Sequence, residues 1–296
     1  MNIRSAEAKD KSVPIKTRVI AGLAPLSLVA AFFWWQHYYP ASASTGWSVD
    51  VLHDNVQKAA SLAKGPSNEI VVSEELQNEA GNIIAIDSSG HRTLLVSKLS
   101  KPDGLAAFDG GYAFSQEGGA APVSLLKNGV VTPLFDAINA QGLLADGDDL
   151  YAVEDRKLNG RLFKYNRVTG QTEILRDSLD EAESFTICPN GDRFYTEKGR
   201  NLVRRFTEDK KDPLFLGPEQ VREPSYLLCD ENGLWVVEDR THLARVLLVS
   251  PQGAVSVIAN HLRAPQVLMK LGSGNDAKYA LAEGGRSRIL ELKKTQ

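Results

Sequence analysis

Cysteine and histidine are scarce in this 296-residue sequence, and their scarcity excludes several kinds of site. Only two cysteines and five histidines are present, and no Cys-x-x-Cys pair occurs. Two cysteines cannot form a disulfide framework, and without a Cys-x-x-Cys pair we expect neither a zinc ribbon nor a covalently attached haem. The histidines are scattered without metal-binding spacing, which argues against a histidine-based transition-metal site.

An excess of positive charge is also missing. Lysine and arginine total 34 against 37 acidic residues, a net charge of −3 at pH 7, so no electrostatic argument favours a nucleic-acid partner. The sequence contains no Gly-x-Ser-x-Gly motif, which argues against serine-based hydrolysis. Its glycine pairs follow strand-like runs rather than preceding helices, which argues against a phosphate-binding loop.

The first 39 residues join a basic segment to a long uncharged one. Residues 1–18 carry five lysines and arginines against two acidic residues, and residues 19–39 carry no formal charge. A helix of about 21 residues spans the roughly 30 Å hydrocarbon core of a bilayer, and the aromatic run at residues 32–39 is typical of a membrane interface. We therefore predict a cytoplasmic basic tail at residues 1–18, a transmembrane signal anchor at residues 19–39 and a linker at residues 40–46.

Two further interpretations of this segment stay open. Ala41-Ser42-Ala43 has the form that a signal peptidase accepts, so cleavage near Ala43 would release a secreted protein. A buried helix of a soluble protein is the other. We favour the uncleaved anchor because the basic segment is long and the uncharged run ends in bulky aromatic residues. Both membrane interpretations place the rest of the chain in the periplasm or extracellular space, either as a single-pass protein of the cell membrane or as a secreted one.

A strand-like run that ends in glutamate is repeated through the remaining sequence. Residues 150–156 read Leu-Tyr-Ala-Val-Glu-Asp-Arg, and residues 234–240 read Leu-Trp-Val-Val-Glu-Asp-Arg. Weaker copies end in Glu74, Glu117, Glu197 and Glu283. The copies recur roughly every 40 residues, a spacing typical of propellers and arrays.

Shorter runs between the glutamates complete a unit of four strands. A turn followed by an apolar strand precedes each copy, as at residues 101–107, and two further strands follow it. Hairpin signals such as Asn128-Gly129 separate these strands. Short strands every 8 to 12 residues without a sustained helical period predict an all-β fold. Four strands in about six repeats predict a six-bladed β-propeller over residues 47–296.

The two ends of the chain are predicted to share the last blade. The sixth repeat supplies three strands before the sequence ends, and a strand-like run at residues 47–52 follows the linker. We predict that this N-terminal strand closes the ring and removes its open edges. An amphipathic helix at residues 49–64 is the alternative that stays open.

These repeats resemble the six-bladed propellers of the gluconolactonase and senescence-marker-protein group, and the related NHL-repeat propellers. The resemblance covers about residues 47–292 and rests on Lys-Pro-Asp-Gly-Leu at 101–105 and Leu-Tyr-Ala-Val-Glu-Asp at 150–155. It implies a divalent ion held by carboxylate and amide groups at the top of the central channel. There the ion would polarise a lactone carbonyl and help a carboxylate to activate water.

The repeated glutamates form the first candidate ring of side chains. Antiparallel first and second strands bring them to one face: Glu74, Glu117, Glu154, Glu197, Glu238 and Glu283. One interpretation is a ring that binds a cation or guards a channel. We favour the other, in which each carboxylate holds its own blade through backbone hydrogen bonds or an arginine a few residues later, because six unpaired carboxylates would repel one another. If the ring is catalytic, the predicted general base is among Glu154, Glu197 and Glu238.

The second ring lies at the start of the first strands, where the repeats differ. Its members are Lys58, Asp103, Gln141, Glu183, Ser225 and Gln266. Asp103, Gln141 and Glu183 come from consecutive blades and offer the oxygen ligands that hard cations such as Ca²⁺ prefer. We predict these three as metal ligands and Lys58, Ser225 and Gln266 as substrate contacts. The alternative is that these side chains cap their own turns.

Three smaller inferences complete the prediction. Cys188 and Cys229 fall at equivalent ends of first strands in adjacent repeats, where they form either two packed thiols, which we favour, or a disulfide. The charged run at residues 208–212 is interpreted as a solvated hairpin tip. The leading functional hypothesis is a divalent-metal-assisted hydrolase of lactones or esters. The alternative is a non-catalytic propeller that binds a small molecule or a membrane-associated protein partner.

Overall fold

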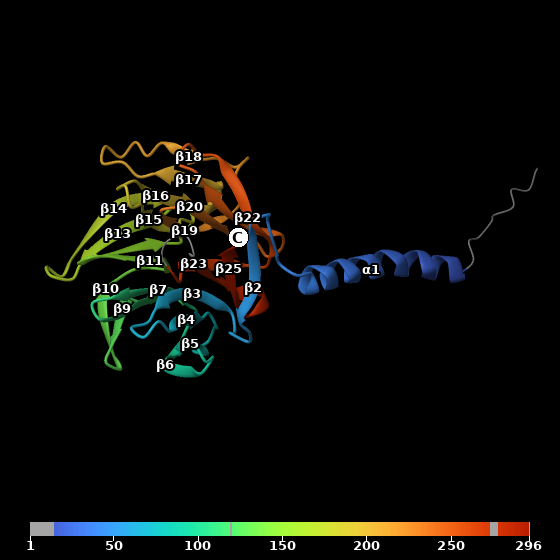
Figure 1. The fold of residues 1–296 in the computed structure, drawn as a ribbon, viewed down its shortest axis with the longest axis horizontal. Helices are drawn as coiled ribbons and strands as arrows, with labels where there is room; N and C mark the ends of the chain where they lie inside the picture. The colour runs from blue at the N-terminus through green and yellow to red at the C-terminus, as the bar shows by residue number, and fades with distance from the viewer. Residues whose placement is uncertain (1–14, 119, 273–277, 296) are drawn as a thin grey trace, which may run out of the picture. The chain divides into compact units, whose positions relative to one another are not determined.

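The computed structural model describes residues 15–118, 120–272 and 278–295, and shows an all-β domain preceded by one helix (Figure 1). Helix α1 covers Ile15–Tyr38, the region in which the anchor was predicted. Among the described residues, no helix combines the length and the apolar character needed to cross a membrane. The transmembrane part of the prediction therefore has no support in the structure. Most of the predicted basic tail lies outside the described residues.

Six antiparallel sheets form the blades, which we number in chain order; five have four strands and one has five. Blades 1 and 2 are β3 (Ala59–Lys64), β4 (Ile70–Glu74), β5 (Gly81–Ile86), β6 (Arg92–Leu99), then β7 (Pro102–Phe108), β8 (Gly111–Gln116), β9 (Val123–Lys127), β10 (Val130–Phe135). Blades 3 and 4 are β11 (Ala140–Asp146), β12 (Asp149–Glu154), β13 (Gly160–Asn166), β14 (Gln171–Leu179), then β15 (Phe185–Ile187), β16 (Arg193–Glu197), β17 (Leu202–Arg205), β18 (Leu214–Leu216). Blades 5 and 6 are β19 (Pro224–Asp230), β20 (Gly233–Glu238), β21 (Ala244–Val249), β22 (Val255–Leu262), then β23 (Pro265–Lys270), β24 (Lys278–Glu283), β25 (Arg288–Lys294), β2 (Trp47–His53).

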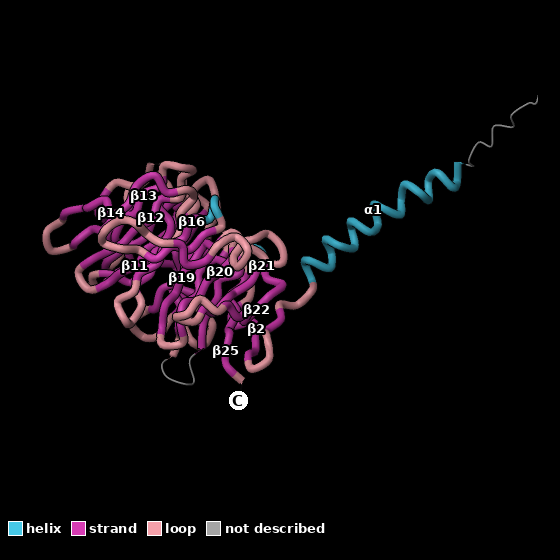
Figure 2. Tube along the Cα trace, turned by 90° about the horizontal axis from the view of Figure 1, so that it is seen from above, coloured by secondary structure: helices cyan, strands magenta, loops and turns pink. Residues whose placement is uncertain are grey.

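The first strands of the blades surround a common axis. Strands β3, β7, β11, β15, β19 and β23 contact one another in sequence, and β23 returns to β3, so the ring is closed. Figure 1 shows these strands gathered at the centre, and Figure 2 shows that strands fill the domain in the perpendicular view. The predicted six-bladed propeller is confirmed.

The second strand of each blade is largely buried because neighbouring blades cover both of its faces. In β12, the four residues at 150–153 are all buried, whereas β13 alternates between buried and partly exposed positions. The core consequently lies between blades. Trp235 of β20 is fully buried and packs against Tyr279 of β24, with ring centroids 4.5 Å apart and ring planes inclined by 47°. Such continuous runs are expected for strands with two covered faces.

The N-terminal strand closes the ring as predicted. Strand β2 pairs with β25, from Trp47 opposite Lys294 to His53 opposite Ile289. The alternative helix at residues 49–64 does not form, because β2 and β3 occupy that segment. Part of the predicted linker is also a strand. Strand β1 (Ser42–Ala43) pairs with β22 and becomes a fifth strand of blade 5.

A disulfide joins blades 4 and 5. Cys188 follows β15 and Cys229 lies in β19, with their Cα atoms 4.8 Å apart. The packed-thiol interpretation is therefore corrected. Equivalent ends of adjacent first strands lie close enough in a closed ring for a direct bond.

Candidate functional site

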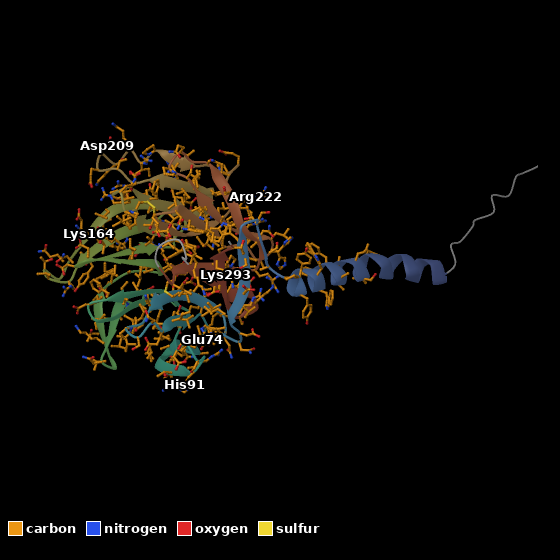
Figure 3. The ribbon with its side chains drawn as sticks, viewed as in Figure 1. Glu74, His91, Lys164, Asp209, Arg222 and Lys293 are labelled. Carbon is orange, nitrogen blue, oxygen red and sulfur yellow. A yellow bond between two sulfur atoms is a disulfide. The ribbon has the colours of Figure 1, made fainter. Side chains whose placement is uncertain are left out.

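A repeated brace ends the second strand of every blade. In five blades a buried glutamate accepts the N–H of a residue just before the first strand, as Glu154 Oε1 does from Ile138 at 2.7 Å. The members of this set are Glu74, Glu154, Glu197, Glu238 and Glu283, and their donors are Gln57, Ile138, Asp180, Arg222 and Arg263. Figure 3 labels Glu74 and Arg222, which belong to the braces of blades 1 and 5.

Arginines occupy the remaining lone pairs of these glutamates in blades 3 to 6. Arg161 donates from Nε and Nη2 to the two oxygens of Glu154, both at 2.7 Å. The equivalent Nε donors are Arg204 to Glu197 at 2.6 Å, Arg245 to Glu238 at 2.7 Å and Arg288 to Glu283 at 2.5 Å. Glu154 and Glu238 are each held by one two-pronged arginine, and Glu197 is held by Arg204 and Arg200 together. A carboxylate bound by arginine on both oxygens and by a backbone N–H is not available to take a proton from water. The geometry therefore favours the structural role and gives no support to Glu154, Glu197 or Glu238 as general base.

Blade 2 departs from this pattern by one position. Gln116, opposite Pro102, accepts the N–H of Ser100 at 2.7 Å and so takes the place of the glutamate. Glu117 is the next residue and belongs to a different set, the residues that directly follow the second strand. We call this set the mouth ring: Glu75, Glu117, Asp155, Lys198, Asp239 and Gly284.

A left-handed residue precedes each first strand and anchors the mouth ring. These residues, with φ between 40° and 51°, are Lys58, Lys101, Asn139, Glu181, Glu223 and Ala264. The carbonyl of each accepts the N–H of its mouth-ring residue at 2.9 to 3.1 Å. Lys58 is therefore a turn residue, two positions from the predicted ring, where Ala60 stands instead. Its predicted role as a substrate contact has no support in the structure.

The other five predicted residues do come together. Asp103, Gln141, Glu183, Ser225 and Gln266 line one cavity of about 20 Å³, and we call these five the inner ring. A void of this size holds about one water molecule or one ion. Four of the five side chains are buried, and Gln266 is partly buried. The prediction that unlike residues at equivalent positions converge is therefore supported, and the cavity that they line is far smaller than a typical ligand pocket.

Asp103 has an unusual environment for a carboxylate. It is 8% exposed and its side chain has no hydrogen-bond partner within the described ranges. Burial, reinforced by the charge of Glu75, raises the pKa of Asp103 to about 7, against the opposing effect of Lys101. Both protonation states of Asp103 are therefore accessible near neutral pH.

Lys198 of the mouth ring is bound between two blades. Its Nζ donates to Glu183 Oε1 and to Asp239 Oδ2, each at 2.8 Å. Burial acts to lower the pKa of Lys198, but the charges of Glu183 and Asp239 outweigh it and raise that pKa. Burial also raises the pKa of Glu183, and Lys198 opposes that shift. The ammonium group is thus a permanent positive charge beside the inner ring.

Gln141 links the same two rings in the neighbouring blades. Its Nε2 donates to Glu117 Oε1 at 2.6 Å and to Asp155 Oδ2 at 3.2 Å. The other oxygen of Asp155 is buried, and among the described residues it has no hydrogen-bond partner. Lys101 contacts both Glu117 and Glu75.

The predicted metal ligands are partly engaged by other groups. Glu183 Oε1 accepts from Lys198, and the Gln141 amide nitrogen is held between two carboxylates, so Asp103 alone of the three makes no side-chain hydrogen bond among the described residues. Within residues 15–118, 120–272 and 278–295, no three histidine, cysteine, aspartate or glutamate side chains are grouped to hold a metal ion. The sequence analysis missed the mouth ring. Its signal was the variation among residues that follow the repeated glutamates.

Comparison with known proteins supports the fold. No protein-family model and no curated protein matches this sequence. A gluconolactonase from Xanthomonas campestris is 10% identical over 86% of this chain and 91% of its own, with a TM-score of 0.68. The calcium-binding protein regucalcin from Agrobacterium tumefaciens is 14% identical over 83% and 94%, with a TM-score of 0.65. An auxiliary nutrient binding protein from Bacteroides thetaiotaomicron is 14% identical over 86% and 76%, with a TM-score of 0.62.

These similarities define the class of the protein. It is a six-bladed β-propeller whose structural neighbours include gluconolactonase and regucalcin, as the repeats predicted. Identities this low establish a shared fold, and function has to be argued from the site.

Proposed function

We propose that this propeller is a hydrolase that opens a lactone or ester bond at the inner ring, with Asp103 as the general base. The observation that carries the proposal is the Asp103 carboxyl, which is buried, unpartnered among the described residues and lines a cavity the size of a water molecule. Amide and hydroxyl groups of Gln141, Gln266 and Ser225 line the same cavity. The neighbouring gluconolactonase fold is consistent with this chemistry.

The reaction needs one proton acceptor and one water molecule. Asp103 takes a proton from water in the cavity, and the hydroxide adds to the carbonyl carbon. The tetrahedral intermediate then breaks its bond to the ring or ester oxygen. That oxygen takes the proton from Asp103, so the products are a free hydroxyl and a carboxylic acid.

The charge around the cavity restricts the substrate. The inner and mouth rings contain six carboxylates, Glu75, Glu117, Asp103, Asp155, Glu183 and Asp239, and one lysine, Lys198. Lys101, a neighbouring turn residue, pairs with two of the carboxylates. An anionic substrate is disfavoured by this balance. We therefore propose an uncharged polar lactone or ester whose carbonyl end reaches the inner ring.

The proposed function includes a cellular compartment for the propeller. The Cys188–Cys229 disulfide is typical of an oxidising compartment. We propose that the propeller works outside the cytoplasm, in the periplasm or extracellular space. Peptide mapping under non-reducing conditions of protein from its native source would detect the linked pair, and free thiols there would contradict this placement.

The test of the activity is turnover of an uncharged lactone and ester panel by the purified protein. Asp103→Asn should lower kcat/KM about 10²- to 10⁴-fold. Asp146→Asn is the matched control, because Asp146 ends β11, the first strand of the neighbouring blade, and is exposed. Activity that survives Asp103→Asn, or no turnover by the wild type, would contradict the proposal.

A binding protein without catalysis is the second candidate. Two observations favour it: the cavity is small, and ion pairs occupy much of the mouth ring. The neighbouring nutrient-binding propeller shows that the fold also occurs in a binding protein. Its ligand would be a small molecule or a membrane-associated protein at the mouth ring. Saturable binding of an uncharged lactone without turnover would favour this candidate over the hydrolase.

A further inference from the structure

We propose that the ammonium group of Lys198 is a built-in cation that replaces a divalent metal ion in this propeller and prevents calcium from binding there. The inference goes beyond the proposed hydrolase function. Its binding consequence holds whether or not the chain is an enzyme, and only its catalytic consequence rests on the proposed function.

The position of Lys198 is fixed from both ends. Its backbone N–H donates to the Glu181 carbonyl at 3.0 Å, at the start of the short turn Lys198–Arg200. Its Nζ bridges Glu183 of blade 4 and Asp239 of blade 5, each at 2.8 Å. An ion bound between Glu183 of blade 4 and Asp239 of blade 5 would need these same oxygens, at about 2.3–2.6 Å from a calcium ion. The ammonium group and a calcium ion therefore compete for one set of ligands.

The charge balance supports the same conclusion. Lys198 is the mouth-ring residue of blade 4, where blades 3 and 5 have Asp155 and Asp239. Burying Glu183 and Asp239 side by side without a cation would be costly. A lysine at this position supplies the charge permanently, and no ion has to be captured from solution. A second lysine, Lys101, bridges Glu75 and Glu117 across blades 1 and 2 in the same manner.

Removing the ammonium group should convert the ring into a calcium site. Lys198→Met keeps most of the side-chain volume but frees Glu183 Oε1 and Asp239 Oδ2, the two oxygens that the ammonium group now holds. Calcium should then bind and raise the melting temperature by roughly 5 °C at a hundredfold excess over its dissociation constant. Wild type, and the control Lys164→Met on β13, the third strand of blade 3, should show no saturable shift. Lys164 is partly exposed and lies within 3.8 to 4.0 Å of its acidic neighbours, so its charge is weakly held.

The experiment is calcium titration of the full chain by calorimetry and thermal melting, without substrate. Tight calcium binding by the wild type would overturn the proposal, and this result does not depend on any variant folding. A folded Lys198→Met protein that fails to bind calcium would also overturn it. If Lys198→Met folds poorly without calcium, recovery of its melting transition on adding calcium supports the proposal, whereas no recovery contradicts it. Lys198→Arg keeps the charge and should stay insensitive to calcium.

A parallel measurement separates this inference from the proposed function. Any lactone or ester turnover by the wild type should be unchanged by a chelator. Turnover that is lost on chelation would overturn the inference and leave the hydrolase proposal standing. If the wild type shows no turnover and the calcium results are as expected, the hydrolase proposal is overturned and this inference stands.

Discussion

Asp103 and Glu154 are both buried carboxylates, yet their surroundings give them opposite roles. Glu154 accepts from the Ile138 N–H and from both donors of the Arg161 fork, so its charge is neutralised and its position is fixed. Asp103 has no such donor among the described residues and faces a cavity instead. Environment rather than residue type therefore separates a structural carboxylate from a candidate base.

The raised pKa of Asp103 predicts an unusual dependence of stability on pH. The folded carboxyl keeps its proton up to about pH 7, whereas an unfolded aspartate loses it near pH 4. The folded state binds more protons in that window, so its stability falls as pH rises from about 4 to 7 and stays lower above. Asp103→Asn should consequently gain stability over the wild type at pH 8 but not at pH 4. Urea denaturation at the two pH values measures this, and an equal difference at both would contradict it.

Asp212 shows what the sequence interpretation of charged runs misses. The run 208–212 was interpreted as a solvated hairpin tip, but Asp212 is buried. It binds Arg176 at 2.5 and 2.9 Å and accepts from the Tyr195 hydroxyl at 3.0 Å. The partners of Asp212 lie on strands of two blades, so the sequence of residues 208–212 alone does not predict the contact.

We predict that Asp212→Ala costs roughly 3 kcal/mol of folding free energy, because it leaves the largely covered Arg176 charge without its carboxylate and with only the carbonyls of Leu175 and Thr207 as acceptors. Asp209→Ala is the matched control in the same loop, where the side chain is exposed and pairs with Lys211. The control should change stability by less than about 0.5 kcal/mol. Urea denaturation of the three proteins gives both differences, and similar values for the two variants would contradict the prediction.

Strands and turns were predictable where the signal is local. The apolar second strands and their terminal glutamates could be identified because each carries its own burial pattern and its own brace. In blade 2 the alignment of the sequence repeats is wrong by one residue. The repeats are aligned by their acidic residues, whereas the pairing of the first and second strands sets the register. Pro102 lies opposite Gln116, and Glu117 comes after the strand. The bridge made by Lys198 was not predictable, because it depends on side chains contributed by two blades.

The disulfide between blades 4 and 5 is predicted to stabilise the fold. It closes a loop with a sequence separation of 41 residues. Removing it by Cys188→Ala with Cys229→Ala should cost about 4 kcal/mol, mainly through the greater freedom of the unfolded chain. The propeller should keep its fold, because the hydrophobic cluster around Phe194 and Leu227 joins the same two blades. Thermal melting of the double variant, and of the wild type with and without reductant, tests this. A change below about 1 kcal/mol would contradict it.

Closure of the ring by β2 is predicted to keep the whole domain from self-associating. Removing residues 1–53 deletes β2, exposes the edge of β25 and removes Trp47 from its contact with Trp235. We expect this truncation to self-associate through the open edge. Removing residues 1–40 keeps β1 and β2 and should leave the protein monodisperse. Size-exclusion chromatography distinguishes the two, and a monodisperse protein lacking residues 1–53 would show that β2 is dispensable.

Because β2 pairs with β25, the two ends of the propeller chain lie side by side in blade 6. The chain ends of the propeller could therefore lie in another exposed loop without loss of the ring. Joining the end of β25 to the start of β2 with a short flexible linker, and reopening the chain in the exposed β13–β14 hairpin, would preserve every strand pair. Such a circular permutant is expected to fold. Its first strand would be β14 of blade 3, which lies near the middle of the present chain.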